Sequence, residues 1–260
     1  TWNATGQTTT STLGSVFTIA GNLTVQSTGS GQFWFASGTS TVTGDYIQSG
    51  GSVRLSGGAT QTLMVRGNFT MSGGTLEMAN ATFIGTLNVA GNFSHTAGTI
   101  QETGTSNGAI VFNGTGTQSY TSGGTVSNTI NFTVNNAATL QMAASSTAIT
   151  GGGTFTLSSG GTLGITSTAG ITSSGAMGNI QVTGTRSFNT AANYIYNGSA
   201  GQVTGNGLPS TVNNLTINNS SDVSLTAGET VNGSLTLTSG ALAIGTTTLV
   251  LNSTVSSGGG

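Results

Sequence analysis

The sequence contains no cysteine, no lysine and only one proline, Pro209. Without cysteine the chain has neither disulfide bonds nor thiolate-bound metal, which fits a secreted protein held together by backbone hydrogen bonds. Charged residues make up 3% of the 260 positions, against roughly 25% in average globular domains. The net charge of −2 includes no basic stripe, and a phosphate backbone needs one to bind. We therefore expect no nucleic-acid partner.

Long apolar runs are also missing, since none approaches the roughly 18 residues that a membrane-spanning helix needs. We expect no membrane span. The sequence opens at Thr1 with neither a basic segment nor an apolar one, so we expect an extracellular or cell-surface protein whose signal peptide has been removed. A weakly charged chain with 44 glycines could be disordered. However, 34% of its residues are hydrophobic and recur in short alternating runs, which indicates an ordered fold.

A repeat of about 23 residues is the strongest signal that is present. Residues 65–78 read VRGNFTMSGGTLEM, and residues 89–102 read VAGNFSHTAGTIQE. The anchoring glycines of four successive copies follow one another at steps of 23, 23 and 24 residues: Gly21, Gly44, Gly67 and Gly91. Later copies are looser, and the register is blurred around 104–128 and 184–212. A clear copy returns at 231–244.

Each copy has the pattern of two short strands joined at a corner. In Phe69-Thr70-Met71 the alternation places Phe69 and Met71 on one face and Thr70 on the other. Glycines follow, which supply the positive φ of a tight corner, and a second alternation then begins. Short strands separated by glycine-rich corners at a fixed period are typical of a coil with one turn per repeat.

Stacking the copies aligns their apolar residues in columns that no single turn could bury. One column is Leu23, Tyr46, Phe69 and Phe93; another is Val53, Leu76 and Ile100. We therefore predict an all-β fold, a single-stranded parallel β-helix (β-solenoid) with about 23 residues per turn and roughly 11 turns. The general preference for right-handed crossovers predicts a right-handed coil.

The pattern divides the chain into four segments. Residues 1–18 form an N-terminal strand segment that is a candidate contact between subunits, and residues 19–208 form the main solenoid. Residues 209–256 form C-terminal solenoid turns, and residues 257–260 a flexible tail. Pro209 lies in a glycine-containing stretch and marks a loop between two runs of repeats.

The repeats resemble those of β-helical proteins of bacterial surfaces, including adhesins and autotransporter passenger regions. The stretches VNNLTINNSS at 212–221 and VNGSLTL at 231–237 are similar to repeats in large secreted proteins of Bacteroidota-type bacteria. This resemblance implies a β-solenoid at the cell surface or outside the cell. It implies no specific activity.

Catalytic chemistry would have to come from five carboxylates, those of Asp45, Glu77, Glu102, Asp222 and Glu229. Glycosidase or lyase chemistry needs two or three of them on one face. Glu77 lies ten residues after its anchoring glycine and Glu102 eleven after its own, so they should face opposite ways. Arg54 also lies ten residues after its anchor, which predicts a structural surface ion pair with Glu77 on the next turn. We predict no catalytic residues and no enzyme.

His95 is the only histidine, and we expect it within the solenoid wall, in the column of Val25, Met71, Val134 and Leu157. No second histidine, cysteine or cluster of Asp accompanies it, so we predict no metal and no cofactor. In Phe33-Trp34-Phe35 alternation turns either Trp34 or its two neighbours outward. An outward Trp34 would stack on a sugar or on a second subunit; the alternative is packing beneath an insertion.

Two further surfaces are candidates for partners. Trp2 and Trp34 are candidates for self-association. An outward threonine column, which would bind ice or a crystalline polysaccharide, is predicted from these residues: Thr24, Thr70, Thr133, Thr156 and Thr236. Ile47 interrupts this column at the second turn.

The leading functional hypothesis is an extracellular structural protein whose copies join end to end as a filament or matrix fibre for adhesion or cell-surface scaffolding. Its partner would be itself, with surface carbohydrate as a second candidate. This follows because no capping element is evident in the sequence and almost no charge opposes a second copy. The alternatives are a segment of a large surface adhesin and the threonine-array solenoid.

Overall fold

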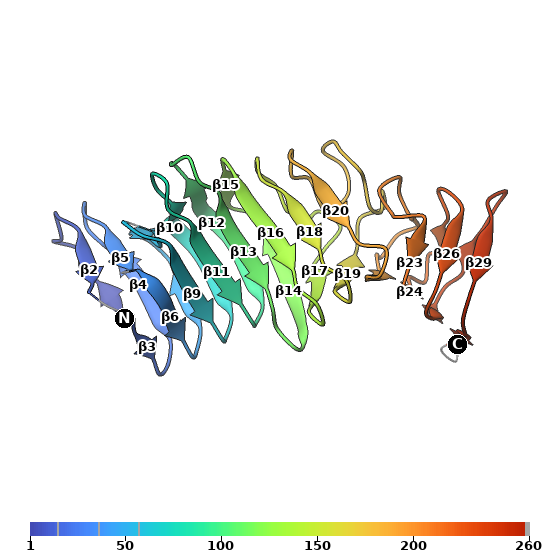
Figure 1. The fold of residues 1–260 in the computed structure, drawn as a ribbon, viewed down its shortest axis with the longest axis horizontal. Helices are drawn as coiled ribbons and strands as arrows, with labels where there is room; N and C mark the ends of the chain where they lie inside the picture. Colours follow the sequence, from blue (N-terminus) through green and yellow to red (C-terminus); the bar gives the residue numbers. More distant parts are fainter. Residues whose placement is uncertain (15, 36, 57, 258–260) are drawn as a thin grey trace.

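The computed structural model describes residues 1–14, 16–35, 37–56 and 58–257. Regular structure in these residues consists of strands β1 to β30, without a helix. The strands stack in parallel as a β-solenoid of about 11 turns with about 23 residues per turn (Figure 1), which confirms the predicted fold class. Among the described residues no helix is long and apolar enough to span a membrane.

A 16-stranded sheet runs the whole length of the coil. Its main path comprises β1 (Trp2–Asn3), β4 (Leu23–Ser27), β7 (Tyr46–Gln48), β10 (Phe69–Ala79), β12 (Phe93–Glu102), β14 (Thr117–Ser122), β17 (Thr139–Met142), β19 (Thr162–Ile165), β21 (Asn193–Tyr196), β24 (Asn214–Asn218), β27 (Leu235–Ser239) and β30 (Val255–Ser257). Four more strands pair with it in the N-terminal half: β2 (Ser11–Leu13), β5 (Phe33–Phe35), β8 (Ser52–Arg54) and β15 (Thr125–Ser127).

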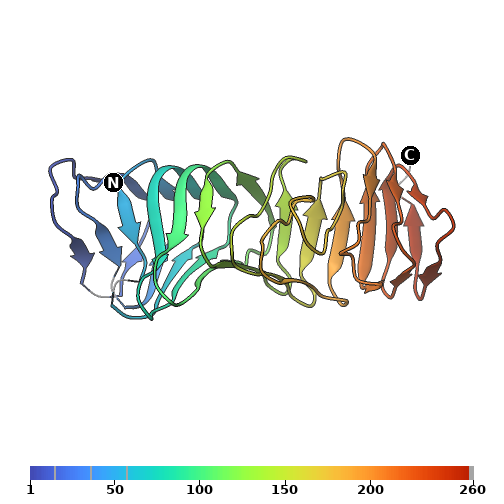
Figure 2. The ribbon, with the colours of Figure 1, turned by 90° about the horizontal axis from the view of Figure 1, so that it is seen from above.

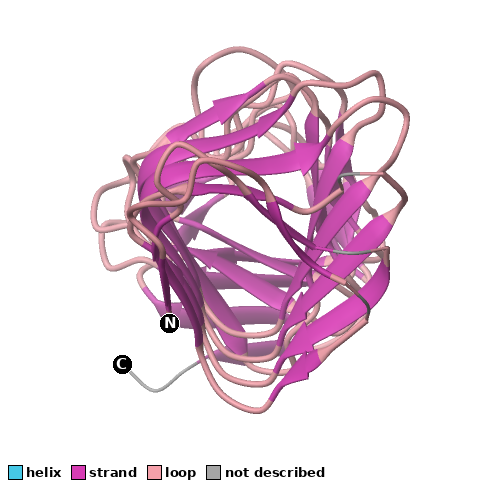
Figure 3. Ribbon diagram, turned by 90° about the vertical axis from the view of Figure 1, so that its left-hand side faces the viewer, coloured by secondary structure: helices cyan, strands magenta, loops and turns pink. Residues whose placement is uncertain are grey.

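The opposite wall changes partway along the coil. An 8-stranded sheet forms it first, from β3 (Thr18–Ile19), β6 (Gly38–Val42), β9 (Gln61–Val65), β11 (Gly85–Val89), β13 (Gly108–Phe112), β16 (Ile130–Val134), β18 (Phe155–Leu157) and β20 (Arg186–Phe188). Two 3-stranded sheets follow it. One holds β22 (Gln202–Val203), β25 (Val223–Ser224) and β28 (Leu242–Ala243), and the other β23 (Thr211–Val212), β26 (Glu229–Val231) and β29 (Leu249–Leu251). Seen down the axis, the strands of successive turns lie behind one another around a common core (Figure 3).

The predicted apolar columns are confirmed by the strand register. Leu23, Tyr46, Phe69 and Phe93 are paired in sequence, as are Val53, Leu76 and Ile100. The first column continues to Tyr120, and its rings stack nearly parallel, with centroids 5.1 Å apart for Tyr46 and Phe69, 4.7 Å for Phe69 and Phe93, and 5.2 Å for Phe93 and Tyr120. Each ring is buried by the turns above and below it, so burial depends on stacking rather than on one turn.

The recurrent Asn or Asp after each anchoring glycine has a structural explanation. The side-chain oxygen of Asn22 accepts the backbone N–H of Asp45 at 2.9 Å, and Asp45 in turn accepts that of Asn68 at 2.7 Å. Asn68 and Asn92 continue the ladder to the following turns at 2.9 and 2.8 Å. These bonds satisfy corner N–H groups that strand pairing leaves free.

The corner glycine Gly74 has φ of +80°. A Cβ atom at this position would lie 2.4 Å from the carbonyl oxygen of Gly51 on the preceding turn. Close stacking of corners therefore requires glycine here, both for conformation and for space.

The spacing of 23 residues is not kept throughout. Thr162 pairs with Asn193, 31 residues further along, because residues 172–178 form an excursion from the coil. Leu215 pairs with Leu235, only 20 residues later. Pro209 lies between β22 and β23, where the wall changes. Of the predicted tail, Ser257 ends β30 and residues 258–260 lie outside the described residues.

Candidate functional site

Glu77 and Glu102 lie near each other on adjacent turns and both are buried, although the sequence predicted that they face opposite ways; a register shift after Glu77 explains the difference. In the described ranges no group of three or more His, Cys, Asp or Glu side chains is placed to hold a metal ion. Asp45 and Asp222 both accept backbone N–H groups of the following turn at corners. Their oxygens therefore serve the stacking of the turns.

Arg54 and Glu77 are paired in register on adjacent turns, with Trp34 one turn earlier in the same outward row. The guanidinium of Arg54 lies over the Trp34 ring, 4.5 Å from its centroid. Glu77 is buried, where the sequence predicted a surface position, and its carboxylate accepts bonds from the Gln101 amide at 2.8 Å and from the backbone and hydroxyl of Thr103 at 2.8 and 2.9 Å. Arg54 and Glu77 are thus neighbours in register, but the Arg54 side chain contacts Trp34 and the Glu77 side chain bonds to Gln101 and Thr103.

The two tryptophans have partners within their own copy. Trp2 packs against Phe33 with ring centroids 4.7 Å apart, and its indole N–H donates to Gln7 at 3.1 Å. Phe33 and Phe35 are buried while Trp34 points outward and is half-buried. The stacking of Trp34 on a sugar or on a second subunit therefore stays a prediction.

The single threonine column predicted from the sequence is wrong. Its members are Thr24, Thr70, Thr133, Thr156 and Thr236. Three of them lie in strands β4, β10 and β27 of the 16-stranded sheet, whereas Thr133 and Thr156 lie in β16 and β18 of the 8-stranded sheet. The sequence pattern placed them in one column because Asn131-Phe132-Thr133 in one wall has the same alternation as Asn92-Phe93-Ser94 in the other. Ile47 does separate Thr24 from Thr70, as predicted.

His95 is buried and pairs with Met71, as predicted. Its Nε2 donates to the carbonyl of Gly98 at 3.1 Å. Burial lowers the pKa of His95, and the bond to Gly98 opposes this in part. The predicted neighbours Val134 and Leu157 lie instead in the 8-stranded sheet, for the same reason as the threonines.

Two acidic side chains are buried with an oxygen that has no hydrogen-bond partner, those of Glu102 and Glu229. Burial raises the pKa of Glu102, and the nearby charge of Glu77 adds to this. Burial raises the pKa of Glu229 to about 7, opposed by the backbone N–H of Thr230. The sequence reasoning missed Glu229, although its spacing of two from Val231 in one strand would have placed it inward.

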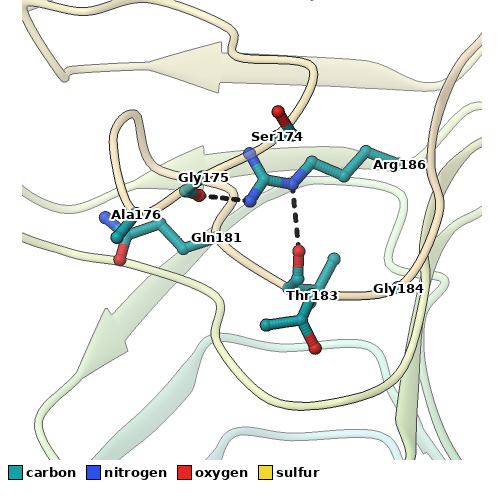
Figure 4. Close-up of a pocket in the computed structure, with 8 residues that line it drawn as sticks. Ser174, Gly175, Ala176, Gln181, Thr183, Gly184 and Arg186 are labelled. Atoms are coloured by element: carbon teal, nitrogen blue, oxygen red, sulfur yellow. Dashed lines mark hydrogen bonds between the residues drawn. The ribbon is translucent and has the colours of Figure 1, made fainter.

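Arg186 holds the excursion of residues 172–178 against the coil (Figure 4). Its Nη1 donates to the carbonyl and hydroxyl oxygens of Thr172 at 3.1 and 2.8 Å, its Nε to the carbonyl of Val182 at 3.1 Å, and its Nη2 to that of Gly175. A pocket of about 290 Å³ lies here, lined by residues 174–176 on one side and by residues 181–184 and Arg186 on the other. Most donors of the guanidinium are thus occupied by backbone carbonyls, which identifies Arg186 as a structural clamp.

Replacing Arg186 with methionine is expected to loosen this excursion, because the carbonyls of Thr172, Gly175 and Val182 lose a charged donor. A local loss of about 1–3 kcal/mol is typical of such bonds. It would appear as hydrogen exchange in residues 172–178 about 5–150 times faster than in the wild type. Arg66→Met, at an exposed corner, is the matched control. Equal exchange in all three proteins would show that Arg186 does not hold the excursion.

The two ends of the coil leave the inward columns uncovered. Val231 is 0% exposed, yet Leu251, its partner on the last turn, is 39% exposed. Leu235 is 4% exposed and its partner Val255 is 54% exposed. At the opposite end Trp2, Leu13, Phe17 and Ile19 are only partly buried. The first and last turns lie at opposite extremes of the rod (Figure 2). The described residues form no helix that covers either turn.

These features define a parallel β-solenoid with apolar, uncovered end turns, and its described residues include no group of acidic, histidine or cysteine side chains placed to hold a metal ion. Comparison of the chain with protein-family models, curated proteins and solved structures finds no match.

Proposed function

We propose that this protein is an extracellular structural subunit whose coils stack end to end into a filament or fibre. The observation that carries the proposal is the continuity of the 16-stranded sheet, which presents an edge at each end of the rod, at β1 and at β30. An open edge offers unpaired N–H and C=O groups to another strand. The second copy would therefore extend the same sheet.

The apolar residues of the end turns support the same contact. Leu251 and Val255 lie in columns that are buried one turn earlier, and a further turn would bury them as well. Burying one such side chain stabilises a contact by about 1.5–3 kcal/mol. With only eight Asp, Glu, Lys and Arg residues in the chain, charge repulsion between copies is small. A head-to-tail contact of this type propagates into an open polymer.

Replacing both Leu251 and Val255 with lysine is expected to raise the concentration needed for assembly by at least about tenfold, since 1.4 kcal/mol corresponds to that factor. The matched control is Met177→Lys with Val203→Lys, which adds the same charge at exposed apolar residues between the ends. Light scattering against concentration measures the effect, and circular dichroism verifies that the coil is retained. Assembly that is equally weakened by both double variants would contradict a contact at the ends.

The second candidate is a segment of a large surface adhesin. Further repeats of the same polypeptide would then pair with the strands at the two ends of the coil. This second candidate rests on the same uncovered columns. It differs in its outcome, because the chain of 260 residues would then remain as short single rods at every concentration.

A further inference from the structure

We propose that a pocket at the ends of three strands of the 8-stranded sheet binds a carboxylate-bearing sugar residue of an acidic polysaccharide. The pocket has a volume of about 390 Å³ and is called the strand-end pocket here. It lies where β9, β11 and β13 end, on three successive turns of the coil (Figure 1). One copy of the chain forms the whole site, so the inference goes beyond the proposed assembly and does not depend on it.

A short side chain between two longer ones creates the strand-end pocket. The last residues of the three strands are paired in register and buried, so the residue after each of them points outward. These outward residues are Arg66, Ala90 and Asn113, one on each turn. The methyl group of Ala90 leaves a gap between the side chains of Arg66 and Asn113. Asn88 and the corner of residues 114–116 line the gap as well.

The polar side chains of the strand-end pocket have unused hydrogen-bonding groups. In the part of the chain that the structure describes, the Arg66 guanidinium and the amides of Asn88 and Asn113 have no hydrogen-bond partner. The other two arginines differ, because Arg54 lies over an aromatic ring and Arg186 donates to backbone carbonyls. The donors of one guanidinium and two complete amide groups therefore surround a single hollow.

The lining of the pocket favours an anion that also carries hydroxyl groups. None of the lining residues is acidic, and Arg66 supplies a positive charge. A guanidinium binds a carboxylate through two parallel hydrogen bonds. The two amides both donate and accept, which suits hydroxyl groups, and Met64 and Val65 present apolar surface to the C–H groups of a ring. A sugar acid combines these three kinds of group in one residue.

The size of the pocket favours one residue of a longer polymer. Ligand pockets usually measure about 300–1,000 Å³, so this pocket lies near the lower limit and has room for a single sugar ring. Arg66 is exposed and both asparagines are half-buried, which leaves the pocket open to a polymer that continues past it. A single contact of this kind is weak, and a polysaccharide that reaches several copies of the chain adds such contacts together.

The test is isothermal titration calorimetry of the 260-residue chain with an oligomer of galacturonate, and with a neutral galactose oligomer of equal length for comparison. Ala90→Leu fills the gap without a change in charge. Ala109→Leu, at a half-buried outward position of β13, is the matched control. We expect the wild type and Ala109→Leu to bind the acidic oligomer alike, and Ala90→Leu to bind it at least about tenfold more weakly. The neutral oligomer should bind at least about tenfold more weakly to the wild type as well.

A second pair of variants separates the guanidinium from the net charge. Arg66→Met should weaken binding of the galacturonate oligomer by at least about tenfold, because the carboxylate loses its charged donor. Met177→Glu gives the chain the same net charge from an exposed residue outside the pocket, and it should bind like the wild type. Circular dichroism verifies that each variant retains the coil.

The other outcomes each overturn the proposal. Failure of the galacturonate oligomer to bind, or equal affinities of the wild type and Ala90→Leu, would show that the strand-end pocket is not the site. Equal weakening by Arg66→Met and Met177→Glu would reduce binding to an effect of net charge. Equally tight binding of polyglutamate would overturn the sugar as the ligand in favour of an acidic peptide. All of these outcomes leave end-to-end stacking unaffected, since calorimetry measures binding to a site that one copy forms.

Discussion

Phe93→Ala is expected to lower the free energy of unfolding by about 3–5 kcal/mol, the range found for removal of a buried aromatic ring. Phe93 is 1% exposed and lies between Phe69 and Tyr120, with centroid distances of 4.7 and 5.2 Å. Its ring also meets Phe112 of the opposite wall edge-on at 5.8 Å. Removal of the ring leaves a cavity that neighbouring turns cannot fill, since each is fixed by its own strand pairing.

Urea unfolding followed by circular dichroism measures this effect. The control is Ser94→Ala, the next residue of the same strand, whose side chain is half-buried on the outer face. It should change the free energy of unfolding by no more than about 0.5 kcal/mol. Similar midpoints for Phe93→Ala and Ser94→Ala would contradict the aromatic column as the core of the coil.

The stability of the protein is expected to fall as the pH rises from about 4.5 to about 7, because of Glu229. The pKa of this buried carboxyl is raised from its ordinary value of 4.5 to about 7, so the folded chain favours its protonated form. The contribution is complete below pH 4.5 and is lost as the pH rises through 7. Each pH unit between these limits corresponds to at most about 1.4 kcal/mol, and screening by solvent lowers the total below about 3 kcal/mol.

Glu229→Gln should remove this part of the pH dependence, and unfolding measured at several pH values compares the two profiles. The raised pKa of Glu102 acts in the same direction, and the lowered pKa of His95 destabilises the fold below about pH 6.5. Both remain in the variant, so the difference between profiles isolates Glu229. Asp222→Asn, at an exposed corner, removes one negative charge elsewhere on the coil and controls for the change in net charge. An unchanged profile in Glu229→Gln would show that Glu229 titrates normally.

The fold was predictable because the residues that stack in one column recur in the sequence at a nearly constant spacing. Gly67-Asn68-Phe69 and Gly91-Asn92-Phe93 fix the corner, the ladder position and the core position of two successive turns, and the structure pairs Phe69 with Phe93. The neighbouring positions of Arg54 and Glu77 follow from the same count. The partners of the two side chains do not follow from the repeat. Trp34 contacts Arg54, and Thr103 contacts Glu77, from positions that the repeat does not specify.

The errors arose where both walls carry the same local pattern. The stretch Asn131-Phe132-Thr133 alternates in the same way as a strand of the 16-stranded sheet. It lies in the other wall, however, where Phe132 pairs with Ile110. Alternation shows which residues point inward, and it does not show which wall a strand belongs to. Arg186 bonds the carbonyls of Val182 and Thr172 at the excursion of residues 172–178, and a carbonyl clamp of this kind has no sequence pattern of its own.

The most direct measurement is negative-stain electron microscopy of the purified 260-residue chain over a range of concentrations. End-to-end stacking predicts filaments of constant width that lengthen as the concentration rises. Short rods of a single length at every concentration would contradict it.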